Sequence, residues 1–341
     1  MMTSQKNSYE RSIDTLVADV YHLIVSGSRD ISDKAYEELG RQVANAVKYQ
    51  LVKTAQANIP LNSEALDFSP PLRMSNVGRP DRHLWYLMKA HENAKAKGVP
   101  LPQHLKEDFS PSKIFSFMYG AILEEVLVWL AEQSGHTVED RQKEVEVEGI
   151  LGHMDCRIDG VGLDVKSASN QSFTKFRNKK ILTDDPFGYM HQLGGYFKDE
   201  PETAHFVANK ETGELTLARY KKEQVPDTAA RIRHLKKIGA SNVAPDKCYQ
   251  DKEIGRNRGL GIGCKGCPFK HECWKDANDG KGLRAFQYAD GIEYLTAVNS
   301  TPRVPEVDPL SPSKVIVNAQ VYSEEEGFFK DYTKAPPPRT L

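Results

Sequence analysis

The stretch GHMDCRIDGVGLDVKS, residues 152–167, decides the fold of this chain. It holds two runs of strand-forming residues separated by a short turn at Asp159-Gly160, which predicts a β-hairpin. Residues two apart on a strand project from the same face, so Asp164 and Lys166 should point to one side of the second strand. The hairpin can bring Asp155 of the first strand beside them. We therefore expect two carboxylates and one lysine to meet at a single position.

Such a group predicts a metal site. Carboxylates held close together are costly unless a cation neutralises them, and hard oxygen ligands suit Mg²⁺ or Mn²⁺. A lysine beside that metal can position or deprotonate a water molecule, while the metal polarises a phosphate group. Asp-x-Lys alone is a weak signal, because it arises often by chance on strands. The preceding Gly-x-x-Asp, Gly152 to Asp155, strengthens the hypothesis of a catalytic site.

A helix upstream of the hairpin can add a third acid. Serine as cap and proline in the first turn predict that it starts at Ser110-Pro111, and it should stop near Gly135. One face carries a stripe at helical spacing: Phe117, Ala121, Glu124 and Val128. An acid in an apolar stripe must be paired, protonated or bound to metal, which points to Glu124. The neighbouring Glu125 stays open as an alternative for the same role.

A helix downstream, beginning near Pro186, carries Gln192 and Tyr196. These residues are four apart and therefore share a helix face. Gly194 and Gly195 lie inside the helix at a cost in stability, which suggests a close approach to backbone or to a ligand. A core helix that tolerates two glycines is the alternative interpretation.

The order of elements along the chain is helix, three strands, helix, then more strands, which predicts an α/β mixed sheet flanked by helices. Residues 1–70 are predicted to be a helical N-terminal extension. Residues 71–295 should form the main domain. Beyond it, residues 296–341 are proline-rich and are expected to be a partly disordered tail.

Cysteines crowd near the end of the predicted main domain. Cys264 and Cys267 are separated by two residues and Cys273 follows after five more, a strong metal signal. Cys248 is the nearest fourth ligand, and the segment 248–273 is therefore expected to be a metal knuckle. The remaining cysteine, Cys156, should face away from the metal as a packed core thiol.

Charge is distributed unevenly, although the net charge is only -1. Residues 219–275 hold 14 Lys or Arg against 6 Asp or Glu, a local excess of +8. Either a solvated surface or a phosphate-binding face explains such a segment. We expect no membrane-spanning segment and no signal peptide, and hence a cytoplasmic protein, or one in the host cytoplasm if it is viral.

Taken in order, GAILEE, GHMD, LDVKS and QLGGY resemble the motifs of the RecB-like exonuclease branch of the PD-(D/E)XK nuclease superfamily, which includes CRISPR-associated adaptation nucleases and, more distantly, phage exonucleases. The resemblance covers roughly residues 75–275. It implies a restriction-endonuclease-like fold, and divalent metal held by Glu124, Asp155, Asp164 and the Val165 carbonyl. It further implies a catalytic Lys166, and DNA contacts from Gln192 and Tyr196. Many relatives have histidine where Glu124 falls.

The cysteine spacing also resembles the iron–sulfur staple of several RecB-like nucleases. In those proteins the first cysteine lies well upstream, where this chain has Pro80. Either Cys248 completes a [4Fe–4S] cluster or the four cysteines bind Zn²⁺, with the cluster slightly favoured.

The leading functional hypothesis is a Mg²⁺- or Mn²⁺-dependent DNA exonuclease acting in recombination, repair or phage replication, with proteins of those processes as possible partners. A structure- or sequence-specific endonuclease on the same fold is the second. The third is a non-catalytic nucleic-acid-binding module, against which the intact Asp155, Asp164 and Lys166 argue.

Overall fold

The structure is a computed structural model that describes residues 11–58, 71–99, 101–102, 111–317 and 320–323. The chain divides into two compact units. The first comprises residues 1–80 and 87–242, and the second comprises residues 81–86 and 243–341. The helix α3 (Asp81–Lys97) contributes its first six residues to the second unit.

The first unit is built on a five-stranded sheet with the order β1-β4-β5-β6-β7. Its strands are β1 (Val138–Glu139), β4 (Cys156–Ile158), β5 (Val161–Ala168), β6 (Glu202–Asn209) and β7 (Leu215–Lys221). The pair β5–β6 is parallel, and the other neighbours are antiparallel. Parallel neighbours need a crossover, which here holds α5 (Asn170–Arg177), a short 3₁₀ turn (Lys180–Leu182) and α6 (Tyr189–Tyr196). The predicted mixed α/β architecture is confirmed.

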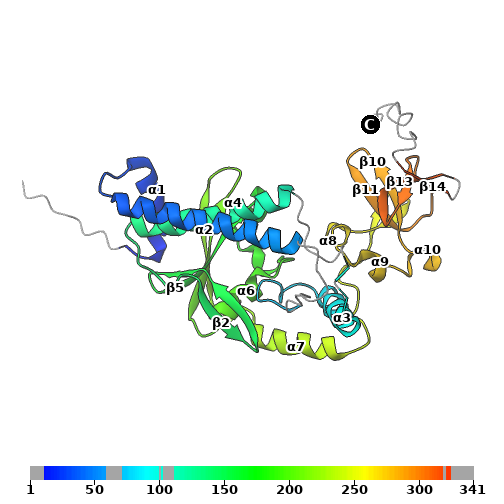
Figure 1. Ribbon diagram of the computed structural model, residues 1–341, viewed down its shortest axis with the longest axis horizontal. Coiled ribbons are helices and arrows are strands. Elements are labelled where there is room, and N and C mark those ends of the chain that lie inside the picture. The colour runs from blue at the N-terminus through cyan, green and yellow to red at the C-terminus, as the bar shows by residue number, and fades with distance from the viewer. Residues whose placement is uncertain (1–10, 59–70, 100, 103–110, 318–319, 324–341) are drawn as a thin grey trace, which may run out of the picture. The chain divides into compact units, whose positions relative to one another are not determined.

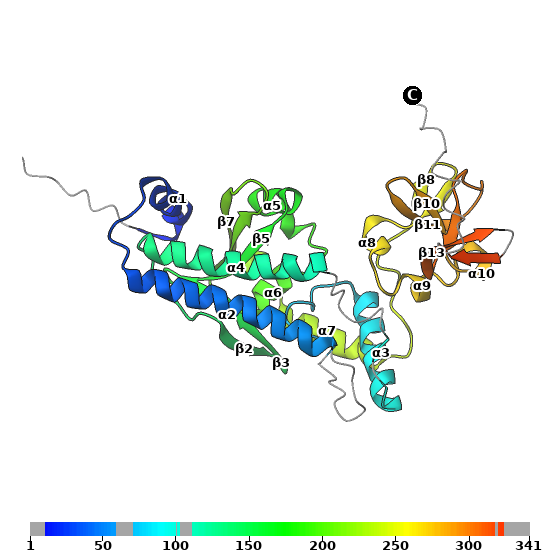
Figure 2. The ribbon, with the colours of Figure 1, turned by 45° about the horizontal axis from the view of Figure 1, so that its top comes forward.

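Helices near the N-terminus belong to this unit and are not a separate extension. They are a 3₁₀ turn (Ile13–Thr15), α1 (Leu16–Ser26) and α2 (Asp33–Asn58). Leu16 and Val20 of α1 share one core with Leu127 of α4 (Pro111–Gln133) and Phe206 of the sheet. Figures 1 and 2 show α2 running along α4. The predicted boundary at residue 70 is therefore wrong for the helices that the structure describes. Ser110, the predicted cap of α4, lies outside the described residues.

The hairpin predicted at Asp159-Gly160 forms between β4 and β5. Strands β2 (Lys143–Val147) and β3 (Ile150–Met154) pair as a separate two-stranded sheet, and Asp155 separates β3 from β4. The hairpin of β6 and β7 is followed by a turn (Lys222–Gln224) and by the basic helix α7 (Thr228–Ala240). Asp227 caps α7, because its Oδ1 accepts a hydrogen bond of 2.9 Å from the amide of Ala230.

The second unit contains a seven-stranded antiparallel sheet with the order β14-β13-β12-β10-β11-β9-β8. Its strands are β8 (Lys252–Ile254), β9 (Asn257–Gly259), β10 (Arg284–Tyr288), β11 (Gly291–Ala297), β12 (Glu306–Asp308), β13 (Ser311–Val317) and β14 (Gln320–Ser323). Short helices α8 (Ile262–Lys265), α9 (Lys270–Cys273) and α10 (Ala277–Gly280) join β9 to β10. The prediction of a tail from residue 296 is wrong as far as Ser323, because β12, β13 and β14 pair in this sheet. The last residues, 324–341, lie outside the described part.

One described helical stretch, Ile114–Gln133 of α4, is long and apolar enough to cross a membrane by length and composition. No membrane-spanning stretch was expected from the sequence. The helix carries Glu124 and Glu125 in its middle, and its Leu127, Val128 and Ala131 lie in the protein core. Core helices of water-soluble domains pass the same test, so the stretch is weak evidence for a membrane and the fold is compatible with a cytoplasmic location.

Candidate active site

Asp155 and Asp164 are brought together by the β4–β5 hairpin. Cys156 pairs with Leu163 across the hairpin, so continuing this register by one residue places Asp155 opposite Asp164. The Asp155 carboxylate also crosses to β5, where its Oδ2 accepts a hydrogen bond of 2.7 Å from the amide of Val165. The structure therefore brings the two predicted carboxylates together. The amide of Val165 is engaged with Asp155, and its carbonyl is the group that the sequence analysis assigned to metal.

Lys166 joins this pair as its position on β5 predicted. Its Nζ lies 2.7 Å from Asp164 Oδ1, and Asp164 itself is fully buried. The second oxygen of Asp164 faces His205 of β6, whose Nε2 lies 3.4 Å away. His205 is also fully buried, and its Nδ1 lies 3.3 Å from the Tyr220 hydroxyl. Asp164 is thus held between an ammonium group and an imidazole.

The choice between Glu124 and Glu125 is decided by their neighbours. Glu125 forms a close ion pair with Arg141. Glu124 accepts a hydrogen bond of 2.8 Å from Gln142 Nε2, and the charges of Lys166 and Asp164 act on its carboxyl group. These contacts favour Glu124 over Glu125 as the third carboxylate of the candidate site.

The ionisation of these groups reflects an excess of negative charge. Burial, with a further contribution from Asp164, raises the pKa of Glu124 to about 7 although Lys166 opposes the rise. Burial and Asp164 likewise raise the pKa of Asp155 well above its ordinary value. For Asp164, Lys166 and His205 outweigh burial and lower the pKa. One lysine neutralises one carboxylate and leaves the other two poorly compensated, which is the electrostatic setting that favours a cation.

Gln192 and Tyr196 lie on α6 beside this cluster. Gln192 Nε2 donates a hydrogen bond of 3.3 Å to the Tyr196 hydroxyl. Burial raises the pKa of Tyr196 to about 12, and the charges of Asp164 and Asp155 also act on that hydroxyl. The Tyr196 ring rests on Gly152, where an added Cβ would lie 2.8 Å from ring atom Cε1. The glycine of the Gly-x-x-Asp motif is therefore needed for close packing.

The two glycines of α6 answer the question that the sequence left open. A Cβ on Gly194 would lie 2.5 Å from the carbonyl oxygen of Pro226, and one on Gly195 would lie 2.3 Å from Met74 Sδ. The close approach is thus to the protein itself. It lets α6 pack tightly against the segment before α7.

Sequence reasoning did not identify Tyr189 or His205 as members of the site. The Lys166 ammonium lies 5.8 Å from the centre of the Tyr189 ring. His205 is positioned by the parallel pairing of β5 and β6, which sets it next to Asp164. The only sequence signal for His205 was its position in the apolar strand segment AHFVANK. Tyr189 had no signal beyond its place in the helix that carries Gln192.

Among the described residues, no three His, Cys, Asp or Glu side chains are arranged so that they could hold a metal ion as they stand. The donor chemistry of the carboxylates nevertheless fits Mg²⁺ or Mn²⁺. Within the described part of the chain, Asp164 Oδ2 is buried and is approached by His205 Nε2 at 3.4 Å without the geometry of a hydrogen bond, and Glu124 and Asp155 carry raised pKa values. Lys166 supplies the positive charge in this arrangement, so metal binding would require side chains to shift.

The knuckle cysteines gather within the second unit. Cys264 is buried and the other three are half-buried. Burial is the main cause that raises the pKa of Cys267 to about 11, and the neighbouring Cys264, Cys248 and Cys273 contribute to the rise. The four thiols therefore lie within electrostatic range of one another. Soft sulfur donors in such a group fit zinc or an iron–sulfur cluster.

The first turn of α3 packs against these thiols. The backbone amides of His83 and Arg82 donate hydrogen bonds to the sulfur of Cys248. His83 Nδ1 lies 3.5 Å from Cys267 Sγ, and the Arg82 side chain donates a hydrogen bond to Cys273. Residues just beyond Pro80 thus contact the knuckle although none of them is a cysteine. Cys156 is fully buried in the core of the first unit, as predicted.

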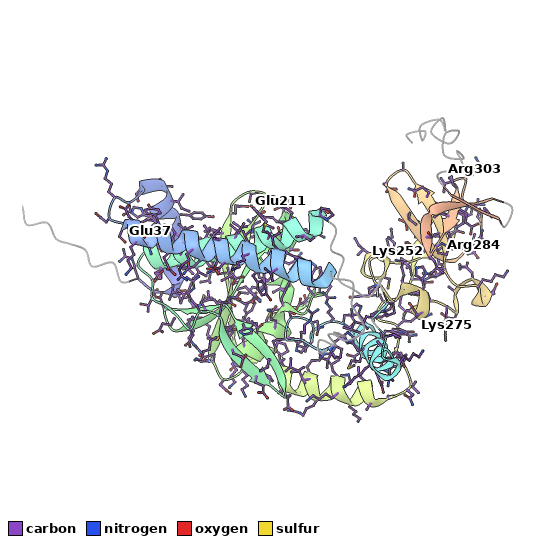
Figure 3. All side chains as sticks on the ribbon, viewed as in Figure 1. Glu37, Glu211, Lys252, Lys275, Arg284 and Arg303 are labelled. Carbon is purple, nitrogen blue, oxygen red and sulfur yellow. The ribbon has the colours of Figure 1, made fainter. Side chains whose placement is uncertain are left out.

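Many cations of the basic segment 219–275 are engaged in ion pairs within the protein. The pairs are Arg219–Glu202, Arg233–Glu148, Lys247–Asp276, Arg258–Asp251 and Lys265–Glu293. The segment is also divided between the two units, with Lys252 and Lys275 on the second (Figure 3). Its excess charge is therefore only partly available for phosphate groups.

No protein-family model and no curated protein matches the chain. Among solved structures, the one entitled "Crystal structure of SSO0001" is similar to it, with 16% sequence identity and a TM-score of 0.33. The match covers 65% of this chain and 93% of that chain. A TM-score this low does not establish a common fold.

The raised pKa of Glu124 predicts how stability depends on pH. The Glu124 carboxyl group binds its proton more tightly in the folded protein than in the unfolded chain. Its contribution to the free energy of unfolding is therefore complete below pH 4.5, the ordinary pKa, and is lost as the pH rises to about 7. In the absence of divalent metal, we compare the melting temperatures of the wild type and Glu124→Gln. Between pH 5 and pH 8 the wild-type value should fall by a few degrees relative to that of the variant, at about 2–4 °C per kcal/mol of lost stability. Added Mg²⁺ should reverse this loss in the wild type alone. If the difference in melting temperature between the wild type and Glu124→Gln does not change with pH, the raised pKa of Glu124 is contradicted.

Proposed function

We propose that this protein is a Mg²⁺- or Mn²⁺-dependent deoxyribonuclease with a PD-(D/E)XK active site of the RecB-like type on a restriction-endonuclease-like fold. The observation that carries the proposal is the convergence of Glu124, Asp155, Asp164 and Lys166 from one helix and one hairpin. Three carboxylates and a lysine around a buried strand form a group suited to phosphodiester hydrolysis. Ordinary core packing does not call for a fully buried Asp164 beside two half-buried carboxylates and a half-buried lysine.

The carboxylates would be the metal ligands, with the Val165 carbonyl beside them. When bound, the metal would supply Lewis acidity toward a phosphate oxygen and lower the pKa of a water molecule. His205 and the amide of Val165 hold Asp164 and Asp155 in position. Preorganised ligands of this kind reduce the cost of adapting to the reacting group.

Lys166 would act through its charge. Burial alone would lower its pKa, but Asp164 and Asp155 outweigh burial and raise it. The ammonium group therefore stays protonated in this arrangement and donates hydrogen bonds. It can orient the attacking water or stabilise negative charge on the phosphate, whereas removal of a proton from water requires a neutral amine.

Exonuclease action is the specific form of the proposal. Gln192 and Tyr196 lie on a helix beside the cluster, where they can contact a strand without reading base edges. None of the described helices of this unit resembles a known major-groove recognition element by its sequence. The knuckle would hold a [4Fe–4S] cluster, with Zn²⁺ as the alternative. Recombination, repair or phage replication is the setting that we expect, in the cytoplasm.

Linear and covalently closed DNA test the mode of cleavage. With Mg²⁺ or Mn²⁺, linear duplexes should be degraded progressively while relaxed closed circles survive. Both substrates should persist when divalent metal is left out, as gel analysis of the products will show. Discrete fragments from the closed circle would show endonuclease activity and contradict the exonuclease form of the proposal. If both DNA substrates persist with and without divalent metal, the nuclease proposal is rejected and the non-catalytic nucleic-acid-binding module remains.

A further inference from the structure

We infer that Arg79 forms a phosphate-binding subsite at the rim of the carboxylate cluster, where it holds a backbone phosphate of the nucleic acid next to the one that is cleaved. This inference rests on the proposed function, since it names a substrate contact for that site. Arg79 lies outside all the motifs that suggested nuclease activity.

The backbone around Arg79 is fixed against the catalytic unit. Gly78 touches Gly188 so closely that a Cβ on Gly78 would lie 2.3 Å from the Gly188 Cα atom. Arg231 of α7 holds the same loop, because its Nε donates to the Val77 carbonyl at 3.0 Å and its second amino nitrogen donates to the Arg79 carbonyl at 2.7 Å. The main chain that carries Arg79 is therefore well anchored.

The contact between Gly78 and Gly188 places Arg79 near the catalytic residues. Gly188 directly precedes Tyr189, whose ring centre lies 5.8 Å from Lys166 Nζ. The charges of Lys166, Asp164 and Arg79 all act on the Tyr189 hydroxyl, whose pKa is raised chiefly by burial. Tyr189 thus lies within electrostatic range of the catalytic residues and of Arg79.

The side chain of Arg79 is free to bind an anion. It is exposed, and within the described ranges its guanidinium makes no ion pair. Arg233 of α7 and Arg219 of β7 differ in this respect, because both are paired with carboxylates. A planar guanidinium on an anchored loop matches the geometry of a phosphate group.

The dependence of DNA binding on salt concentration tests whether Arg79 contacts a phosphate. Binding of a single-stranded oligonucleotide is measured by fluorescence anisotropy at several salt concentrations without added Mg²⁺ or Mn²⁺, for the wild type, Arg79→Gln and Arg79→Lys. The control is Lys222→Gln, which removes an exposed cation beyond the edge strand β7. Arg79→Gln should weaken binding about tenfold and reduce the slope of log affinity against log salt by about 0.7. Arg79→Lys should restore the slope, because the charge is kept.

Oligonucleotides with one neutral methylphosphonate at successive positions locate the contact. At one position the methylphosphonate should reduce the affinity of the wild type but not that of Arg79→Gln. Lys222→Gln should show the same dependence on position as the wild type. An unchanged slope and an unchanged pattern in Arg79→Gln would overturn the subsite, even if the wild type cleaves DNA. If the wild type binds DNA with this pattern but never cleaves it, the nuclease proposal fails and the Arg79 contact stands.

Discussion

Asp164→Asn and Lys166→Ala should each reduce DNA cleavage by about 10²- to 10³-fold or more, the scale seen when a preorganised electrostatic group is removed from an active site. Asp164 Oδ1 and Lys166 Nζ are 2.7 Å apart at the centre of the carboxylate cluster, so each substitution removes a charge from the reacting position. Affinity for DNA should change much less, since phosphate contacts elsewhere supply most of the binding. Single-turnover cleavage and anisotropy measurements separate the two effects.

The folding of these variants needs its own check. Asp164 is fully buried between Lys166 and His205, and the loss of one partner from a buried charged pair is often destabilising by about 3–5 kcal/mol. Asparagine keeps the shape of the side chain, and Lys166→Arg keeps the charge. Lys222→Ala is the matched control for loss of a lysine outside the site. Wild-type turnover in folded Asp164→Asn or Lys166→Ala would remove these residues from the active site.

Cys267→Ser should release the metal of the knuckle and lower the melting temperature of the protein by more than about 5 °C. Metal binding in such sites is coupled to folding, because the metal would join ligands that come from short helices and loops. Protein purified without oxygen should contain bound iron or zinc, and a brown colour would indicate the cluster. Elemental analysis of the wild type and the variant measures the loss.

Two other cysteines sharpen this experiment. Cys156→Ala removes a thiol from the core of the first unit and should leave the metal content unchanged. Cys248→Ser should lose metal as Cys267→Ser does if Cys248 is the fourth ligand. The position of the Cys248 sulfur at the first turn of α3, where it accepts backbone hydrogen bonds, favours that result. Wild-type protein with neither iron nor zinc would refute the knuckle as a metal site.

Local rules account for the parts of the fold that were predicted. Alternation of residues and the turn signal at Asp159-Gly160 located the β4–β5 hairpin, because side-chain direction on a strand follows directly from its two-residue repeat. The same repeat placed Asp164 and Lys166 on one face, and one turn of helix placed Gln192 near Tyr196. Each of these inferences needed only residues close together in the chain.

The failures involve contacts between distant residues or signals that proline obscured. Strands β12, β13 and β14 were mistaken for a tail because proline-rich sequence suggested an irregular chain. In the structure β12 pairs with β10, β13 with β12 and β14 with β13, which satisfies their backbone groups. The basic segment looked available for nucleic acid because the sequence does not reveal that Glu148, Glu202 and Asp276 lie beside its cations.

By itself, the sequence determined the hairpin, the helix α4 and the shared face of Asp164 and Lys166, since short-range backbone geometry suffices for these. Only the tertiary structure distinguishes Glu124, on which the charges of Lys166 and Asp164 act, from Glu125, which pairs with Arg141. It alone set His205 behind Asp164, through parallel pairing of two strands that a long crossover separates. The physical reason is that helical neighbours such as Glu124 and Glu125 differ little in local pattern. Their roles follow from which charges the rest of the chain brings within a few ångströms of each.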